Sequence, residues 1–286
     1  MSDLQANSPT IGVFDSGFGG LTVLRALIDQ LPQARFAFLG DTARLPYGSK
    51  SRRTIARYAA QSAQFLVSEQ GAEFLVIACN TASALALDAI QDAVSVPVLG
   101  VIAPGASAAR AASRTGDVLV IATDATVHSH AYSAACRALG LRAHEKACPL
   151  LVPLVEEGWI DPSLTTGSIA AQVIRIYLDE LTAESSALGL NPDVLVLGCT
   201  HYPLIRPLIE QAVPTGIQVI DSAEAVAESA AHLLGQTQSQ SNASPLAQES
   251  AQLRCFATDS VEKFARLGSR FLGRPVGNVE LVDLGG

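Results

Sequence analysis

Two cysteines stand in matching settings in the two halves of the sequence. Cys79 follows an apolar run at residues 74–78, and Cys199 follows another at residues 194–198. A run of aliphatic residues that ends in a small residue is typical of a buried parallel strand, and open α/β sheets place their chemistry at the carboxyl ends of such strands. Two thiols in duplicated settings favour a symmetric reaction, one that needs the same kind of group on opposite sides of a substrate.

The residues that follow the two cysteines add to this interpretation. All of them can form hydrogen bonds: Asn80 and Thr81 after the first cysteine, and Thr200 and His201 after the second. A helix that begins at such a point is expected to lower the pKa of the thiol, because its N-terminus stabilises a thiolate, whereas burial in an apolar wall would raise it. His201 is close enough in sequence to Cys199 to relay a proton.

Two polar turns in the first half are further candidates for binding. Asp15-Ser16-Gly17 lies between a strand-like run and a helical pattern, so its N–H groups are placed to bind a small carboxylate. The alternative is a tight turn in which Asp15 caps the helix. The segment matches neither GxGxxG nor a P-loop, so a nucleotide is a less expected ligand here than a small carboxylate. Residues 41–50, with Pro46-Tyr47-Gly48, predict either a binding loop or a structural turn.

Composition limits the class of protein. The chain has 286 residues, of which 49% are hydrophobic and 16% charged, as is usual for a folded protein of one or two domains. The net charge is -8 and there are only three lysines, so nucleic acid is not an expected partner. No stretch has the length of a membrane span, and residues 1–9 do not resemble a signal peptide. We therefore predict a cytoplasmic protein that does not bind a membrane.

The remaining cysteines and two histidines are given no chemistry. The five cysteines form no Cys-x-x-Cys pair, which argues against both a disulfide framework and a zinc site, so we expect reduced thiols and no bound metal. Cys136, Cys148 and Cys255 lack the polar neighbours described above and are expected to pack in the core. His128 and His130 have no third ligand nearby and favour a solvated turn.

Short apolar runs alternate with helical patterns, an order typical of parallel α/β sheets. Strands are predicted at residues 10–14, 35–39, 73–78, 96–101, 118–122, 194–198 and 218–220, and helices at 21–30, 51–70, 82–93, 103–113, 130–139 and 166–181. Because the runs at 10–14 and 74–78 are echoed at 118–122 and 194–198, we predict an α/β fold of two related lobes with parallel sheets flanked by helices. The active site is expected in the cleft between the lobes.

The lobes are assigned by where the motifs repeat. The first lobe is predicted to comprise residues 1–102 and 215–286, and the second residues 103–214. Residues 236–252 are rich in Gln, Ser and Ala and predict a flexible loop.

Several motifs together resemble the signature set of bacterial glutamate racemases, in the aspartate/glutamate racemase family. In the family's order they are Asp15-Ser16-Gly17, Pro46-Tyr47-Gly48, Cys79-Asn80-Thr81 with its flanking alanines, residues 100–105, residues 153–158 and residues 198–203. The resemblance spans nearly the whole chain. It implies an isomerase that interconverts L- and D-glutamate without a cofactor and supplies D-glutamate for peptidoglycan synthesis.

The resemblance also implies a role for each motif residue. Cys79 would deprotonate D-glutamate, and Cys199 would then deliver a proton from the opposite face. In the other direction Cys199 would deprotonate L-glutamate, and Cys79 would deliver the proton. Asp15 would assist Cys79, and His201 with Glu156 would assist Cys199, the alternative to Glu156 being Glu157. The substrate would be held by Asp15, Ser16, Pro46, Tyr47, Gly48, Asn80, Thr81, Thr123, Thr200 and His201. Thr123 follows an alanine, where the family often has glycine.

Three alternatives remain open at this point. A relative with the same fold could act on aspartate, a hydantoin or another α-substituted acid. A cysteine hydrolase or amidotransferase would form an acyl intermediate on one thiol with help from His201. A non-catalytic binding protein would bind glutamate without exchanging its α-hydrogen. The resemblance leaves a homodimer open, and the short segment before Ile11 predicts no activation by a cell-wall precursor of the kind that some relatives show.

Overall fold

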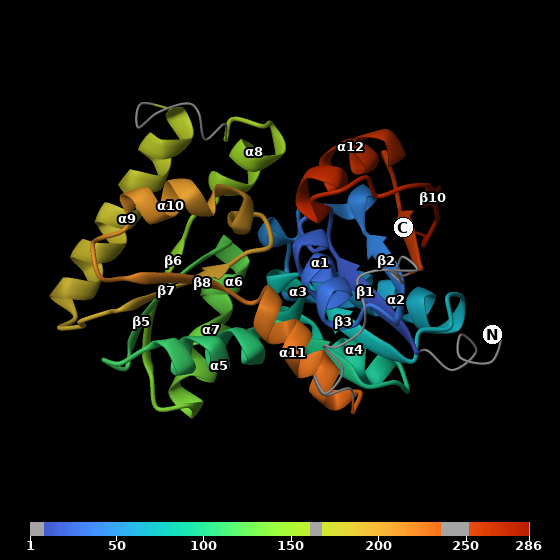
Figure 1. The fold of residues 1–286 in the computed structure, drawn as a ribbon, viewed down its shortest axis with the longest axis horizontal. Coiled ribbons are helices and arrows are strands. Elements are labelled where there is room, and N and C mark those ends of the chain that lie inside the picture. The colour runs from blue at the N-terminus through green and yellow to red at the C-terminus, as the bar shows by residue number, and fades with distance from the viewer. Residues whose placement is uncertain (1–8, 161–167, 236–251, 286) are drawn as a thin grey trace, which may run out of the picture. The chain divides into compact units, whose positions relative to one another are not determined.

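The computed structural model of the protein describes residues 9–160, 168–235 and 252–285 (Figure 1). Its internal contacts divide the chain into two compact units, Met1–Val101 with Ala223–Gly286, and Ile102–Ser222. Each unit is a parallel sheet flanked by helices, which confirms the predicted α/β class. Among the described residues, no helix combines the length and the apolar character needed to cross a membrane.

The first unit contains a six-stranded sheet in the order β10-β9-β2-β1-β3-β4, and all its neighbouring strands are parallel. The strands are β1 (Thr10–Asp15), β2 (Arg35–Gly40), β3 (Phe74–Ile77), β4 (Val98–Gly100), β9 (Leu253–Ala257) and β10 (Val279–Leu281). The central strands β1 and β3 are buried almost throughout because helices cover both faces of the sheet.

Two groups of helices pack in the first unit. One group is α1 (Leu21–Gln30), α11 (Ala223–Leu233) and α12 (Val261–Leu272); the other is α2 (Arg52–Ser68), α3 (Asn80–Leu85) and α4 (Leu87–Ala93). Two 3-10 turns, η2 (Thr42–Arg44) and η3 (Tyr47–Ser49), follow β2. Figure 1 shows α1 and α11 side by side, so a helix from the returning chain completes the packing around α1.

The second unit contains a four-stranded parallel sheet in the order β6-β5-β7-β8. Its strands are β5 (Asp117–Ala122), β6 (Arg142–Ala147), β7 (Val194–Gly198) and β8 (Gln218–Asp221). Its helices are α5 (Ile102–Ala112), α6 (Asp124–Ser129), α7 (Ala131–Ala138), α8 (Leu151–Glu156), α9 (Ile169–Ala187) and α10 (Arg206–Ala212), with a 3-10 turn η4 (Tyr202–Ile205). In Figure 1, α9 and α10 lie on one side of the sheet and α5 and α7 on the other.

The two sheets share one strand order. In the first unit β2-β1-β3-β4 are consecutive neighbours, and in the second unit β6-β5-β7-β8 are arranged in the same way. Cys79 follows β3 after one intervening residue, Ala78, and Cys199 follows β7 directly, so the two cysteines lie just beyond the ends of equivalent strands. The duplication inferred from the sequence is therefore present in the topology.

Some details of the predicted organisation are wrong. Residues 215–222 belong to the second unit and not to the first, because β8 pairs with β7 there. The helical pattern at 82–93 forms two helices, because Ala86 has φ -134° and ψ 2° and interrupts the helical conformation. Strands β6, β9 and β10 have no counterpart in the prediction. The loop predicted at 236–252 lies outside the described residues, apart from its last position.

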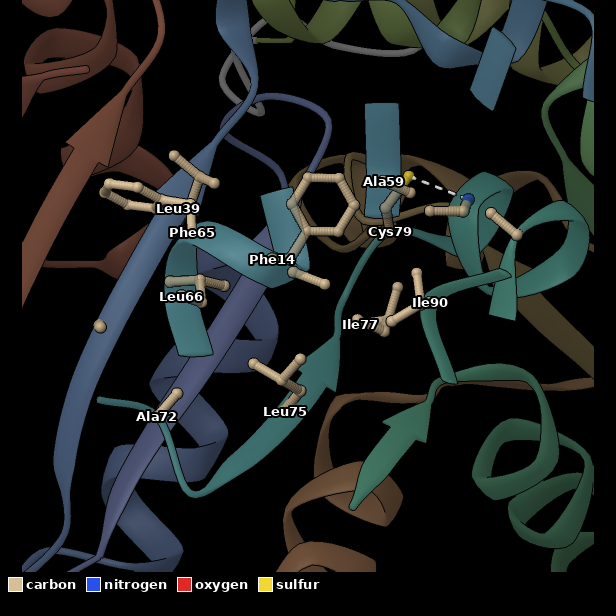
Figure 2. Packing of buried hydrophobic residues seen from close by; sticks show 14 of the residues in the cluster. Phe14, Leu39, Ala59, Phe65, Leu66, Ala72, Leu75, Ile77, Cys79 and Ile90 are labelled. Carbon is tan, nitrogen blue, oxygen red and sulfur yellow. Dashed lines mark hydrogen bonds between the residues drawn. The ribbon is translucent and has the colours of Figure 1, made fainter. Parts of the chain in front are cut away.

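The core of the first unit extends up to its cysteine. Buried side chains from β1, β2, β3, α2 and α3 form one cluster, which includes Phe14, Tyr47 and Cys79. Figure 2 shows Cys79 among these side chains, with a dashed line from its sulfur to a backbone nitrogen. The thiol of Cys79 is thus fixed by core packing as well as by hydrogen bonds.

Candidate active site

The first half-site lies at the carboxyl ends of β1, β2 and β3. Asp15, the last residue of β1, pairs with Gly40 of β2, and Phe14 pairs with Ile77 of β3. Because the strands are parallel, the residues that follow them emerge at the same edge of the sheet. The structure therefore brings Asp15, Ser16 and Cys79 together, as the sequence predicted for a strand-end site.

Cys79 is the N-cap of α3 and forms two hydrogen bonds through its sulfur. Its Sγ accepts from the backbone N–H of Ala82 at 3.4 Å and donates to Ser16 Oγ at 3.4 Å. The residue is only 5% exposed. Asn80 and Thr81 form the first turn of α3 and are buried beside it. Both the helix start and the polar neighbours expected from the sequence are present.

The expected lowering of the thiol pKa is not observed at Cys79. Burial, and then the negative charge of Asp15, raise the pKa of this thiol to about 12, although its hydrogen-bonding contacts with Ser16 and Ala82 act in the opposite direction. The helix N-terminus contributes as predicted, but desolvation of a thiolate costs more. Cys79 is therefore protonated at neutral pH in the unliganded protein, a state suited to donating a proton.

The turn after β1 is packed tightly against the ends of β1 and β3. Asp15 is 1% exposed, and its Oδ2 accepts from the backbone N–H of Gly17 at 2.9 Å. At Gly20, which precedes α1, a Cβ atom would stand 2.6 Å from Asp15 Cβ and 2.8 Å from Ala78 Cβ. A glycine is required there so that α1 can begin beside the strand ends.

This close approach gives a testable expectation for Gly20→Ala. The added methyl group has to displace Asp15 or Ala78, so we expect the free energy of unfolding to fall by about 1–3 kcal/mol, measured by urea denaturation. Gly17→Ala is the matched control, because a Cβ at Gly17 would meet its nearest side-chain atom only at 3.6 Å. Equal stability of the two variants would contradict the steric argument.

The second polar segment, residues 41–50, follows β2 and is fixed by a buried hydrogen bond. Tyr47 is 1% exposed, and its hydroxyl donates to Asp41 Oδ2 at 2.5 Å. Pro46 precedes the 3-10 turn that contains Tyr47 and Gly48. The phenol is thus held by a buried carboxylate, and contact of this segment with a substrate stays a prediction.

The second half-site lies at the carboxyl ends of β5 and β7. Ala122 pairs with Gly198, so Thr123 and Cys199, the next residues of each chain segment, emerge next to each other. Thr123 caps α6, and its Oγ1 lies 2.9 Å from Thr126 Oγ1. Cys199 and Thr200 are both buried, at 6% and 7% exposure. Thr123 therefore lies at the strand end beside Cys199, and its contact with a substrate stays a prediction.

A chain of three side chains runs away from Cys199. His201 Nδ1 lies 3.9 Å from Cys199 Sγ, and His201 Nε2 lies 3.2 Å from Glu156 Oε1. Glu156 ends α8, whereas its neighbour Glu157 is exposed. The contact with His201 is therefore made by Glu156, the first of the two glutamates that the sequence offered.

The charge on His201 follows from these two contacts. Burial alone would lower the pKa of the imidazole, but the hydrogen bonds and charges of Cys199 and Glu156 raise the pKa of His201 to about 10. His201 therefore places a positive charge between the sulfur of Cys199 and the carboxylate of Glu156. A charged hydrogen-bond donor beside the sulfur suits this half-site to proton transfer.

The register of the two sheets identifies equivalent residues. Relative to the cysteines, Ser16 corresponds to Thr123, and Asp15 corresponds to Ala122. Two residues after each cysteine, Thr81 of the first unit stands where the second unit has His201. The two strand ends therefore share a backbone arrangement, but the charged residue beside the thiol differs. It is an aspartate beside Cys79 and a histidine beside Cys199.

The structure also shows what the sequence analysis did not resolve. Asp41 was included in the polar segment at 41–50 without a role, yet it is fully buried and bound by several side chains. His128 contacts the backbone and carboxylate of Asp124 in α6, and His130 joins α6 to α7. Within the described ranges, no three His, Cys, Asp or Glu side chains gather as a metal site would need.

Comparison with known proteins identifies the family. The model of the Asp/Glu/hydantoin racemase family matches residues 11–230. The chain belongs to the Asp/Glu/hydantoin racemase family. Its relatives include the glutamate racemase of Koribacter versatilis, which is 54% identical over 99% of this chain and 100% of the relative.

Solved structures of glutamate racemases share the fold over the same extent. An isoform from Bacillus anthracis has a TM-score of 0.82 and 35% identity, covering 96% of this chain and 98% of that one. The enzyme of Francisella tularensis in complex with D-glutamate also has a TM-score of 0.82 and 35% identity, covering 97% of this chain and 98% of the other. Racemases are isomerases, so the enzyme class expected from the sequence is confirmed for this member of the Asp/Glu/hydantoin racemase family.

Proposed function

We propose that the protein interconverts L- and D-glutamate by proton transfer through Cys79 and Cys199. The observation that carries the proposal is the pair of equivalent strand ends, one with a protonated thiol beside Asp15 and the other with a sulfur beside the imidazolium of His201. Racemisation requires one group to remove the α-proton and a second group to return a proton to the other face. The similarity to proteins named glutamate racemase supports glutamate as the substrate.

We propose the following proton balance for one turnover. With L-glutamate bound, the Cys199 thiolate takes the α-proton and becomes a thiol, which leaves a carbanion on the substrate. Cys79 then gives its thiol proton to the opposite face of that carbanion and becomes a thiolate, and D-glutamate is formed. The reverse reaction uses Cys79 as base and Cys199 as acid. The mechanism requires that a single bound glutamate reaches both sulfurs.

The carbanion is the costly species, since an α-proton is only weakly acidic. Hydrogen-bond donors already aimed at the substrate carboxylate stabilise the charge that spreads onto it. Asn80 and Thr81 at the start of α3, together with Ser16, are the donors we assign in the first unit. In the second unit we assign Thr123 and Thr200, which adjoin Cys199.

The remaining residues are assigned to binding and to support of the two thiols. Pro46, Tyr47 and Gly48 contribute the loop beside Cys79, Asp15 assists Cys79, and His201 with Glu156 assists Cys199. The reaction is proposed to proceed without a cofactor and to supply D-glutamate for peptidoglycan synthesis.

Wash-in of solvent deuterium at the α-carbon tests the proposal. Purified protein without added cofactor is incubated in deuterium oxide with L-glutamate and, separately, with D-glutamate, and the α-proton signal is followed by NMR. We expect loss of the signal from both enantiomers together with inversion. Exchange of the α-proton of aspartate but not of glutamate would show that aspartate is the substrate. Exchange in neither amino acid would reject the racemase proposal for glutamate.

A further inference from the structure

Asp41 is a fully buried carboxylate beside the first half-site. It follows β2, and its backbone N–H donates to the carbonyl oxygen of Asp15 at 3.0 Å. Its side chain accepts from Arg44 Nε at 2.8 and 2.9 Å, from the Tyr47 hydroxyl at 2.5 Å, and from Thr258 Oγ1 at 3.0 Å. Charge-assisted hydrogen bonds from three different side chains fix a buried carboxylate in one place.

We propose that Asp41 is a positioning residue for racemisation, which holds the segment Pro46-Tyr47-Gly48 in place beside Cys79. It acts through Tyr47 and touches neither the substrate nor the reacting sulfur. The inference rests on the proposed function, because it assigns a purpose to a loop that we place at the substrate. It goes beyond that function by connecting the loop to parts of the chain that have no direct role in it.

The position of Tyr47 carries the first step of the argument. Its ring centroid lies 6.1 Å from that of Phe14 in β1, and Tyr47 belongs to the same buried cluster as Cys79. The turn η3 packs against α3, the helix that Cys79 caps. Burial, and then the charge of Asp41, raise the pKa of the phenol, so it stays protonated and remains a donor. Because η3 packs against α3, a movement of the Tyr47 ring would move the backbone next to Cys79.

The second step is the anchor supplied by the returning chain. Thr258, which follows β9, donates to Asp41, and its Oγ1 also accepts from the backbone N–H of Ala43 at 2.9 Å. Thr42 Oγ1 donates to the carbonyl oxygen of Asp259 at 2.5 Å and accepts from its N–H at 2.9 Å. The loop is thus tied to a segment 217 residues away in sequence. Strand β9 therefore contributes to the site without supplying a residue to it.

Arg44 provides a third restraint on the loop. Its Nη1 donates to Gln61 Oε1 at 2.6 Å, and its guanidinium lies 4.4 Å from the ring centroid of Tyr58 in α2. The ion pair with Asp41 is buried, with the side chains 9% and 0% exposed. Removing the carboxylate would leave this cation without its partner, which is costly in such surroundings. Asp41 is the common centre of all three restraints.

The test compares Asp41→Asn and Thr258→Val with the wild type. We expect KM for both glutamate enantiomers to rise about tenfold in each variant while kcat changes by a smaller factor, because the thiols are intact and the binding loop is displaced. Amide hydrogen exchange of residues 47–49 should become faster in both variants. Thr258→Ser keeps the hydroxyl and should restore KM and exchange to near the wild-type values.

Asp193→Asn is the matched control for a loss of stability alone. Asp193 is 9% exposed, accepts from Ser113 and Thr115 and from backbone N–H groups, and precedes β7 at the end of the strand opposite to Cys199. It should lower stability but leave KM unchanged. An unchanged KM in Asp41→Asn and Thr258→Val, or an equal rise in Asp193→Asn, would overturn the inference.

The two proposals can fail separately. If the wild type does not racemise glutamate, the proposed function fails, and the inference is then decided by amide exchange. Unaltered exchange of residues 47–49 in both Asp41→Asn and Thr258→Val would overturn it. If the wild type racemises glutamate, and Asp41→Asn and Thr258→Val show the same KM as the control Asp193→Asn, the proposed function stands and the role of Asp41 is rejected.

Discussion

Replacing either Cys79 or Cys199 with alanine is expected to lower kcat/KM for racemisation by about 10³-fold or more, because each direction of the reaction needs both groups. One sulfur takes a proton and the other supplies one, and neither step has a substitute among the neighbouring side chains that we assign to binding. Racemisation is followed by the optical rotation of glutamate solutions. A cysteine hydrolase would instead depend on only one of the two thiols.

Deuterium wash-in makes this expectation specific to each face of the substrate. Cys79→Ala retains Cys199 and should exchange the α-proton of L-glutamate with retention of configuration, whereas Cys199→Ala should exchange that of D-glutamate. Exchange of the opposite enantiomer in either variant would reverse the assignment of the two thiols. Cys136→Ala is the control, because Cys136 is fully buried in α7 and has no role in the mechanism, so its activity should stay close to that of the wild type.

The parts of the fold that could be predicted are those with a continuous apolar signal. Strands β1, β3, β5 and β7 are central and buried on both faces, so their sequences are largely apolar. Strand β6 lies at the edge of its sheet and contains Arg142, Glu145 and Lys146 among its six residues, so it has no such run. A signal was available for α12, where Phe264, Leu267 and Phe271 recur at helical spacing on its buried face.

The candidate site could likewise be predicted only in part. The strand-end cysteines and their polar neighbours could be located from the sequence, because the chemistry of parallel sheets lies at strand ends. The pKa of Cys79 could not, since it depends on whether desolvation or the helix start dominates, and that balance is set by packing. Partners far apart in sequence, such as Asp41 with Thr258, had no local signal at all.

Glu156→Gln tests the polar chain behind Cys199. The amide removes the negative charge that Glu156 places beside His201, so we expect the pKa of His201 to fall below its present value of about 10. A raised pKa in the folded state stabilises the protein fully below about pH 6.5 and loses that effect as the pH rises through about 10. The variant should therefore lose stability and activity at a lower pH than the wild type, with kcat/KM near neutral pH reduced on the order of 10- to 100-fold.

Glu157→Gln is the matched control, because Glu157 is the exposed neighbour of Glu156. It should keep the pH profile of the wild type in both unfolding and activity. A profile of Glu156→Gln that coincides with that of Glu157→Gln would remove Glu156 from the mechanism. The same comparison decides between the two glutamates in function as well as in contact.

Isotope effects can assign the defect of Glu156→Gln to one thiol. Enantiomers have equal free energies, so any variant must lower kcat/KM by the same factor in both directions, and the steady-state ratio carries no information about which thiol is impaired. If Glu156 acts through His201 on Cys199, proton transfer at Cys199 becomes the slower step. The primary deuterium effect on kcat/KM should then rise for α-deuterated L-glutamate and fall for α-deuterated D-glutamate. Equal changes for both enantiomers would mean that Glu156 supports the site as a whole and not the base beside it.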